Sequence, residues 1–395
     1  MNSKIICNFI IITVLLFSCK NLKPETIPAE KEEIFTKQET SNNPAVHTLT
    51  LLAAGDNLYH ETILKSTVKN EHYDFTPIYT EVKDIIKKAG IAFINQETVM
   101  AGESFEYSGF PNFNTPQVLA QTLADTGFDI LNIANNHTWD MGKAGLLATL
   151  DFLDTIEGIT VIGARKTGKN YKIITKNNIT MGFLSYTFGL NGYTLPADSP
   201  NLVSLIDRKA MAKDLAELRP LCDFLIVSMH WGEEYRLSPG PDQISLAAFL
   251  AEHNVDIIIG HHPHVLQPFE IIARPDGKET FCFYSLGNFV SNQREKERVL
   301  GAFMIITLVK KEQEPSVEDS AESSAELSIS DPGLLPFVCH FEQSFHNTKA
   351  IPLYLYSEEM AEKHWIRAKD DAFTMDFFYT ILNGLKTKII MHDPF

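Results

Sequence analysis

Leu131-Asn132-Ile133-Ala134-Asn135-Asn136-His137-Thr138-Trp139-Asp140-Met141-Gly142 is the stretch that decides the fold. Its first residues continue an apolar run that follows the turn-forming Gly127, and this run predicts a buried strand over residues 128–134. Two amides, an imidazole and a carboxylate then follow within residues 135–140. A polar turn with a capping Asn is the alternative explanation. Because sites in α/β proteins form at the carboxyl ends of strands, the stretch indicates an α/β fold with a functional site there.

The overall composition is that of a globular protein. The chain has 395 residues, of which 44% are hydrophobic and 21% are charged, and this length allows one large domain or two smaller ones. A formal net charge of −16 argues against nucleic acid as a partner, because the polyanion would be repelled over much of the surface. Cys222, Cys282 and Cys339 lack paired spacing, so we expect free thiols in the core.

The amino terminus has the pattern of a secreted lipoprotein. Residues 1–18 hold one lysine followed by an apolar run that suits a signal peptide. Leu16-Phe17-Ser18-Cys19 resembles the bacterial lipobox, so we expect lipidation of Cys19 and a polar tether over residues 19–46. A signal peptide with a coincidental cysteine is the alternative. The pattern predicts a protein of the bacterial cell envelope, lipid-anchored to a membrane outside the cytoplasm.

Five other β-forming runs also end in polar or ionisable side chains. They are residues 47–54, 91–94, 223–229, 255–259 and 281–286, which are followed by Asp56, Glu97, His230, the group His261, His262 and His264, and Asn288. Uncompensated burial of three imidazoles would be costly, so metal ligation is the natural explanation of the histidine group. A solvated histidine-rich loop is the alternative. We expect Asn288 to support the ligands rather than to be one.

The remaining elements follow from periodicity and turn residues. Helices are expected over residues 76–89, 144–156 and 242–253, and a hairpin over residues 171–186 turns at Asn177-Asn178. Residues 310–332, acidic and Ser-rich, interrupt two strand-like runs and predict a disordered insertion. The main domain is expected over residues 47–345, and residues 346–395 are expected to form a helical extension.

The polar strand ends together predict a metal centre. The expected ligands are Asp56, Glu97, Asn136, His230, His261, His262 and His264. Carboxylate, amide and imidazole ligands suit Mn, Fe or Zn better than Mg or Ca, and a bridging carboxylate would support two ions. A His-x-His pair selects His262 and His264, whereas adjacency to Gly260 selects His261. We expect His137 to act as a ligand or as the acid for the leaving group, with Asp140 as its orienting partner.

At these residues the chain resembles the CapA family of bacterial capsule and poly-γ-glutamate synthesis proteins, itself similar to calcineurin-like metallophosphatases. The resemblance covers roughly residues 48–309 and rests on Gly55-Asp56, Asn95-Gln96-Glu97, Ala134-Asn135-Asn136-His137, His230-Trp231-Gly232-Glu233, Gly260-His261-His262-Pro263-His264-Val265-Leu266-Gln267 and Ser285-Leu286-Gly287-Asn288-Phe289. It implies a central β-sandwich flanked by helices, with a metal centre. The chain departs from the metallophosphatase pattern where Leu58, Glu97 and Thr138 replace a histidine and two acids.

Two functions fit these expectations. The first is a membrane-anchored, metal-dependent hydrolase that acts on an anionic envelope polymer or its precursor, such as poly-γ-glutamate. The second is a noncatalytic lipoprotein subunit that binds or exports an acidic envelope polymer. The resemblance also implies a polymer-synthase complex as a partner, and loss of activity on metal removal would separate the two functions.

Overall fold

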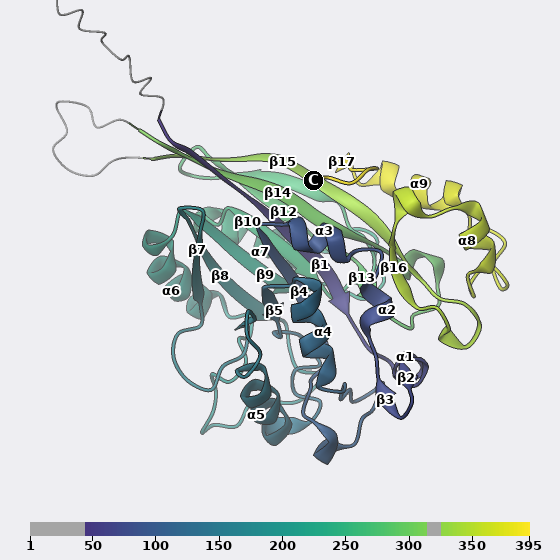
Figure 1. Ribbon diagram of the computed structural model, residues 1–395. Coiled ribbons are helices and arrows are strands. Elements are labelled where there is room, and N and C mark those ends of the chain that lie inside the picture. The colour runs from purple at the N-terminus through teal and green to yellow at the C-terminus, as the bar shows by residue number, and fades with distance from the viewer. Residues whose placement is uncertain (1–43, 314–324) are drawn as a thin grey trace, which may run out of the picture. The chain divides into compact units, whose positions relative to one another are not determined.

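Two β-sheets stacked on each other form the centre of the structure (Figure 1). The computed structural model describes residues 44–313 and 325–395, and residues 44–395 group into one compact unit. The signal peptide, Cys19 and nearly all of the tether lie outside the described residues. Within the described residues, no helix is long and apolar enough to span a bilayer.

The larger sheet has the strand order β16-β15-β14-β1-β4-β5-β6. Its strands are β1 (Val46–Asn57), β4 (Ile91–Gln96), β5 (Ile130–Asn132), β6 (Thr160–Ile162), β14 (Leu300–Glu312), β15 (Ala325–His340) and β16 (Lys349–Pro352), with β13 (Asn288–Val290) beside β1 and β17 (Lys388–Ile389) beside β15. Strands β1, β4, β5 and β6 are parallel, so their carboxyl ends share one edge.

The smaller sheet has the order β11-β12-β10-β9-β8-β7. Its strands are β7 (Lys172–Lys176), β8 (Ile179–Thr187), β9 (Phe224–His230), β10 (Ile257–His261), β11 (Phe269–Ala273) and β12 (Glu279–Phe283). A separate two-stranded ribbon joins β2 (Val68–Lys69) and β3 (His72–Tyr73). Strands β8, β9, β10 and β12 are parallel, so the smaller sheet also gathers its carboxyl ends along one edge.

Helices flank the two sheets (Figure 1). They are α1 (Glu61–Ser66), α2 (Thr76–Tyr79), α3 (Lys83–Lys88), α4 (Val118–Thr126), α5 (Gly142–Leu153), α6 (Arg208–Leu218), α7 (Pro241–Glu252), α8 (Glu358–Lys363) and α9 (Met375–Gly384), with short 3-10 turns at Glu103–Phe105, Arg219–Leu221, Lys296–Arg298, Gln343–Phe345 and Leu353–Leu355. The predicted fold class, a central β-sandwich flanked by helices, is confirmed.

Much of the sequence-based element assignment is confirmed. The hairpin turns at Asn177 and Asn178, which have φ angles of 49° and 61°, as a two-residue hairpin turn requires. Cys222, Cys282 and Cys339 are free, and Cys282 and Cys339 are buried in the core as expected, whereas Cys222 is only half-buried.

Two expectations were wrong. In place of the single helix expected over residues 76–89, the structure has α2 and α3. Between them the chain makes a tight turn, in which Val82 N–H donates to Tyr79 O at 3.1 Å, and α3 begins after this turn. The insertion predicted over residues 310–332 was too wide. Antiparallel pairing of β14 with β15 continues out to Glu312 and Ala325, and residues 314–324 lie outside the described part of the chain.

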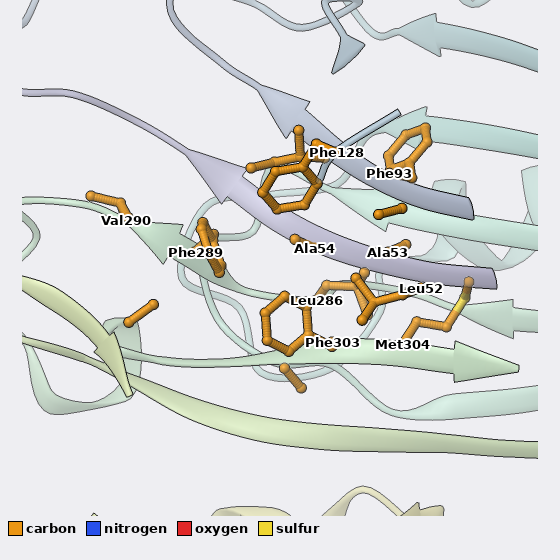
Figure 2. Close-up of a cluster of buried hydrophobic side chains, with 14 of the residues drawn as sticks. Leu52, Ala53, Ala54, Phe93, Phe128, Leu286, Phe289, Val290, Phe303 and Met304 are labelled. Atoms are coloured by element: carbon orange, nitrogen blue, oxygen red, sulfur yellow. The ribbon is translucent and has the colours of Figure 1, made fainter. Parts of the chain in front are cut away.

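An aromatic core lies directly behind the polar strand ends (Figure 2). Phe289 has ring-centroid distances of 5.6 Å to Phe303 and 6.0 Å to Phe128, and all three side chains are buried. Burying a phenylalanine side chain stabilises a fold by about 1.5–3 kcal/mol. This packing fixes the backbone of β1 and β13, which carry the first polar groups of the site.

Candidate metal centre

The polar ends of four strands from the two sheets meet in one buried cluster. Asp56 lies at the end of β1 and Glu97 directly follows β4, while His230 and His261 end β9 and β10. All four side chains are fully buried. The sequence gathers them because each parallel strand delivers its next residue to the same edge of the sandwich.

Asp56 is the most strongly supported carboxylate of the cluster. Its Oδ2 lies 3.0 Å from His264 Nδ1, and its Oδ1 accepts a hydrogen bond from Asn95 Nδ2 at 2.8 Å. The backbone N–H of His262 also donates to Oδ2, at 3.2 Å. Burial alone would raise the pKa of Asp56, but its contacts with His261 and His264 hold this pKa well below the ordinary value. Asp56 is therefore an anion within the protein interior.

Glu97 faces two imidazoles without hydrogen-bonding to either. Its Oε1 lies 3.6 Å from His230 Nε2 and 3.6 Å from His264 Nε2. Burial and the charge of Asp56 raise the pKa of Glu97 well above its usual value. The two carboxylates also act on His264, whose pKa is raised to about 9 by Glu97 and Asp56 although burial opposes this. Two carboxyl groups so close together can both ionise only beside a positive partner.

The donor set fits divalent metal ions. Among the described residues, both oxygens of Glu97 and the Nδ1 atoms of His230 and His262 are buried without a hydrogen-bond partner. Such buried polar atoms are costly unless something satisfies them. Burial lowers the pKa of His262 to about 4 and that of His230 well below its ordinary value, so both imidazoles are neutral and free to ligate.

Among residues 44–313 and 325–395, three groups of side chains could each hold an ion, because their ligand atoms lie within 4.8 Å of one another. They are Asp56 with Glu97 and His264, Glu97 with His230 and His262, and Glu234 with His262 and His264. His262 and His264 thus belong to these groups, as the His-x-His alternative expects. His261 belongs to none of them. Its ring stacks on Phe93 at 5.8 Å, and its Nδ1 lies 3.4 Å from Asp56.

Amide side chains hold two of the histidines in place. Asn136 Oδ1 lies 2.8 Å from His230 Nε2, and Asn136 Nδ2 donates to Asn191 Oδ1 at 2.9 Å. Asn288 Oδ1 lies 2.9 Å from His264 Nδ1, which is the supporting role expected for it. Asn136 therefore stands close enough to the cluster to be a ligand or to orient one.

His137 lies beside the cluster but outside the three ligand groups. Its Nδ1 is 2.8 Å from Asp140 Oδ2, and the Phe113 ring packs edge-on against the imidazole at 4.7 Å. The backbone N–H of Phe113 also donates to Asp140 Oδ2, at 2.7 Å. Asp140 thus fixes both the imidazole and the loop that covers it.

Aromatic rings form the rim of the centre. Phe188 is 50% exposed, and its ring lies 4.6 Å from that of His262. Tyr235 lies 6.1 Å from His264, and His60 packs against Phe113 at 5.1 Å. Burial lowers the pKa of His60 to about 4, and the positive charge of His264 acts in the same direction. The two imidazoles inside this rim, His262 and His264, are only 5% and 2% exposed.

Sequence reasoning missed several residues of the site. Glu234 lies four residues after His230 and His60 four residues after Asp56, so their position near a strand end was a usable signal. Asn191 comes from the loop between β8 and α6, and nothing in its spacing marked it. Asn95 belongs to a recognised motif, but its bond to Asp56 depends on the pairing of β1 with β4.

The fold and the cluster define a class: a β-sandwich protein with a carboxylate–histidine centre of metal-binding type at the carboxyl ends of its strands. The model of the bacterial capsule synthesis protein family PGA_cap matches residues 50–293. The chain belongs to this family.

Curated relatives agree with this assignment. The chain is 34% identical over 182 residues to the capsule biosynthesis protein CapA of Bacillus anthracis, covering 44% of this chain and 42% of the relative. It is 33% identical over 189 residues to the PGA biosynthesis protein CapA of Bacillus subtilis, covering 46% of this chain and 47% of the relative. The chain thus matches somewhat less than half the length of each.

Among solved structures, the chain is similar to the NAD nucleotidase of Haemophilus influenzae. That similarity has a TM-score of 0.42 at 14% sequence identity, covering 88% of this chain and 65% of the nucleotidase.

Proposed function

We propose that this protein is a metal-dependent hydrolase of the cell envelope that cleaves an anionic polymer, poly-γ-glutamate or a precursor of it. The observation that carries the proposal is the buried set of Asp56, Glu97, His230, His262 and His264, whose ligand atoms form groups of three within 4.8 Å of one another. In the described part of the chain, Glu97, His230 and His262 also hold buried polar atoms without a hydrogen-bond partner. The names of the Bacillus relatives supply the polymer class.

The side chains of the cluster would bind metal ions, and His137 beside the cluster would transfer a proton. Asp56, Glu97 and the histidines would hold two divalent ions, which would lower the pKa of a bound water and stabilise charge on the attacked centre. His137 stands beside them with Nδ1 held by Asp140. When Nδ1 carries a proton and donates a hydrogen bond to Asp140, Nε2 is the atom that exchanges a proton with the substrate. Asp140 fixes the ring orientation that this exchange needs.

Charge supports metal-mediated recognition of an acidic substrate. The chain carries a formal net charge of −16, so an acidic polymer is repelled by much of the surface. Metal ions at the strand ends would reverse the local sign of the potential and attract carboxylates to the centre. The polymer is thus drawn to the site and to few other places on the protein.

The test of the proposed function uses the full chain, purified free of metal and then loaded with Mn²⁺, Zn²⁺ or Fe²⁺. Poly-γ-glutamate is incubated with each form, and its chain length is followed by gel electrophoresis and mass spectrometry. We expect metal-dependent shortening that is lost in His230→Ala. Metal-dependent binding of the polymer without shortening would overturn the hydrolase and favour the noncatalytic polymer-binding subunit. A chain that binds no metal would overturn the proposed hydrolase.

We also propose that Cys19 is lipidated and anchors the chain to a membrane outside the cytoplasm, where it would meet a polymer-synthase complex. The lipobox-like Leu16-Phe17-Ser18-Cys19 motif supports this. Mass analysis of the mature amino terminus tests the proposal. A terminus other than Cys19, or an unmodified Cys19, would contradict it.

A further inference from the structure

Two loops at the edge of the smaller sheet are joined by their backbones. Trp231 N–H donates to His261 O at 3.1 Å, and Tyr235 N–H donates to Pro263 O at 2.7 Å. The first loop follows β9 and carries Glu234, and the second follows β10 and carries the ligating histidines. These two bonds fix the loop of Glu234 against the histidine loop.

The backbone of both loops is held in an uncommon conformation. Tyr235, His262 and His264 have φ angles of 67°, 96° and 57°, in the left-handed region that non-glycine residues seldom occupy. A non-glycine residue in this conformation is strained and persists only where the surroundings impose it. Here the strain aims Glu234, His262 and His264 at one point, since their ligand atoms lie within 4.8 Å of one another.

His262 supplies an independent sign that this point takes a ligand. His262 is only 5% exposed, and its Nδ1 atom has no hydrogen-bond partner in the described part of the chain. Glu234, by contrast, is exposed, and it is the one exposed member of the three ligand groups found among the described residues. The neighbouring Glu233 is also exposed, but it pairs with Arg236 at 3.3 Å and belongs to none of these groups.

We propose that Glu234 is a metal ligand that, with His262 and His264, holds the outer of two ions in the centre. The inference rests on the proposed function only in requiring that the centre binds metal. The two groups whose members are all buried, Asp56 with Glu97 and His264, and Glu97 with His230 and His262, offer the place for the inner ion. The outer ion has one ligand in contact with solvent, so it binds more weakly and exchanges faster. A carboxylate of the acidic substrate approaching from solvent reaches this ion first and can replace Glu234 on it.

Metal binding itself tests the assignment of Glu234. The full chain is stripped of metal and titrated with Mn²⁺, and in parallel with Zn²⁺, by calorimetry, with elemental analysis after desalting. We expect two ions of unequal affinity in the wild type. Glu234→Gln should keep the tight ion and weaken the other by about 10–100-fold, the size of effect known for groups that support metal ligands. The matched control Glu233→Gln should behave like the wild type.

Each other outcome is decisive. If Glu234→Gln binds two ions as the wild type does, Glu234 is not a ligand, and the proposed hydrolase is untouched. One ion in the wild type, or loss of the tight ion in Glu234→Gln, also overturns the inference while leaving a metal centre. No ion in the wild type overturns the inference and the proposed function together. Thermal unfolding of both variants without metal confirms that each is folded.

Discussion

His230 Nε2 lies 2.8 Å from Asn136 Oδ1, although 94 residues separate the two. This contact joins the end of β9 in the smaller sheet to the loop after β5 in the larger one. Neither sheet alone holds the full set of proposed ligands. Binding of a metal ion by these ligands would therefore be coupled to the packing of one sheet on the other.

The first prediction follows from this coupling. An ion that binds the folded chain and not the unfolded chain should stabilise the fold by about 2.7 kcal/mol at 100 times its dissociation constant. We expect Mn²⁺ or Zn²⁺ to raise the melting temperature of the metal-stripped protein, and a chelator to reverse the rise. His230→Ala should lose most of the effect. A rise of equal size in that variant would show that the metal stabilises the chain from elsewhere.

A second prediction concerns Gly260, which precedes the histidine loop. A Cβ atom at this position would lie 1.9 Å from the backbone oxygen of Tyr284 in the neighbouring chain segment. Backbone atoms cannot move aside as a flexible side chain can. Gly260→Ala should therefore lower the free energy of unfolding by about 3 kcal/mol or more, the upper end of the range for overpacked substitutions. Urea unfolding measures this cost.

The control for Gly260 is Gly189→Ala, because a Cβ atom at Gly189 has no atom within 4 Å. It should change the free energy of unfolding by less than about 0.5 kcal/mol, as surface substitutions do. Equal stability of the two alanine variants would mean that the strand ends are not packed as tightly as described.

The third prediction concerns pH and a histidine far from the metal centre in sequence. His364 is buried; its Nδ1 accepts the Ile366 N–H at 3.1 Å, and its Nε2 lies 3.2 Å from Cys339 O. Burial lowers the pKa of His364 to about 3. In the unfolded chain the imidazole of His364 has its ordinary pKa, near 6.5. Above that pH the imidazole is neutral in both states, and its contribution to the stability of the fold is fully present. This stability is lost as pH falls from about 6.5 towards 3.

The variant His364→Phe isolates this effect. A phenyl ring fits beside Phe341 and Phe373, whose centroids lie 4.4 Å from the imidazole, but it does not titrate. Below pH 6.5 the free energy of unfolding of the wild type should fall by up to about 1.4 kcal/mol per pH unit more than that of the variant. Chemical unfolding at intervals from pH 7 to pH 4 measures the two slopes. Parallel slopes would show that His364 does not carry the acid sensitivity.

The strand ends were predictable because their physical signals are local. Residues 224–229 are apolar except for Ser228 and are followed by His230, and this pattern identifies both the strand and the candidate residue. The same holds for Asp56 and Glu97, since each follows a fully buried run at the edge where parallel strands end.

Other parts of the site depend on contacts that the sequence does not encode locally. The role proposed for Glu234 requires the backbone bond from Tyr235 to Pro263, which joins two loops. The break between α2 and α3 reflects tertiary packing. Tyr79, at the end of α2, is buried, and its hydroxyl lies 2.5 Å from that of Tyr59. Periodicity alone predicted a continuous helix there. Tertiary packing overrode the local preference.

The last prediction separates a catalytic His137 from a structural one. His137 belongs to none of the three ligand groups, so His137→Ala should leave bound metal unchanged in elemental analysis. If the imidazole transfers a proton, turnover should fall by about 10²–10⁴-fold.

Asp140→Asn provides the matched comparison, and its effect should be of a different kind. Asp140 Oδ2 receives the Phe113 N–H as well as facing His137 Nδ1, so the change should lower turnover by about 10–100-fold and also destabilise the fold by roughly 1–3 kcal/mol. A purely structural His137 predicts the opposite order, with His137→Ala lowering the melting temperature strongly and sparing turnover per folded molecule. Measuring turnover, metal content and thermal unfolding on both variants distinguishes these cases, because only a proton-transferring His137 lowers turnover while metal content and melting temperature stay at their wild-type values.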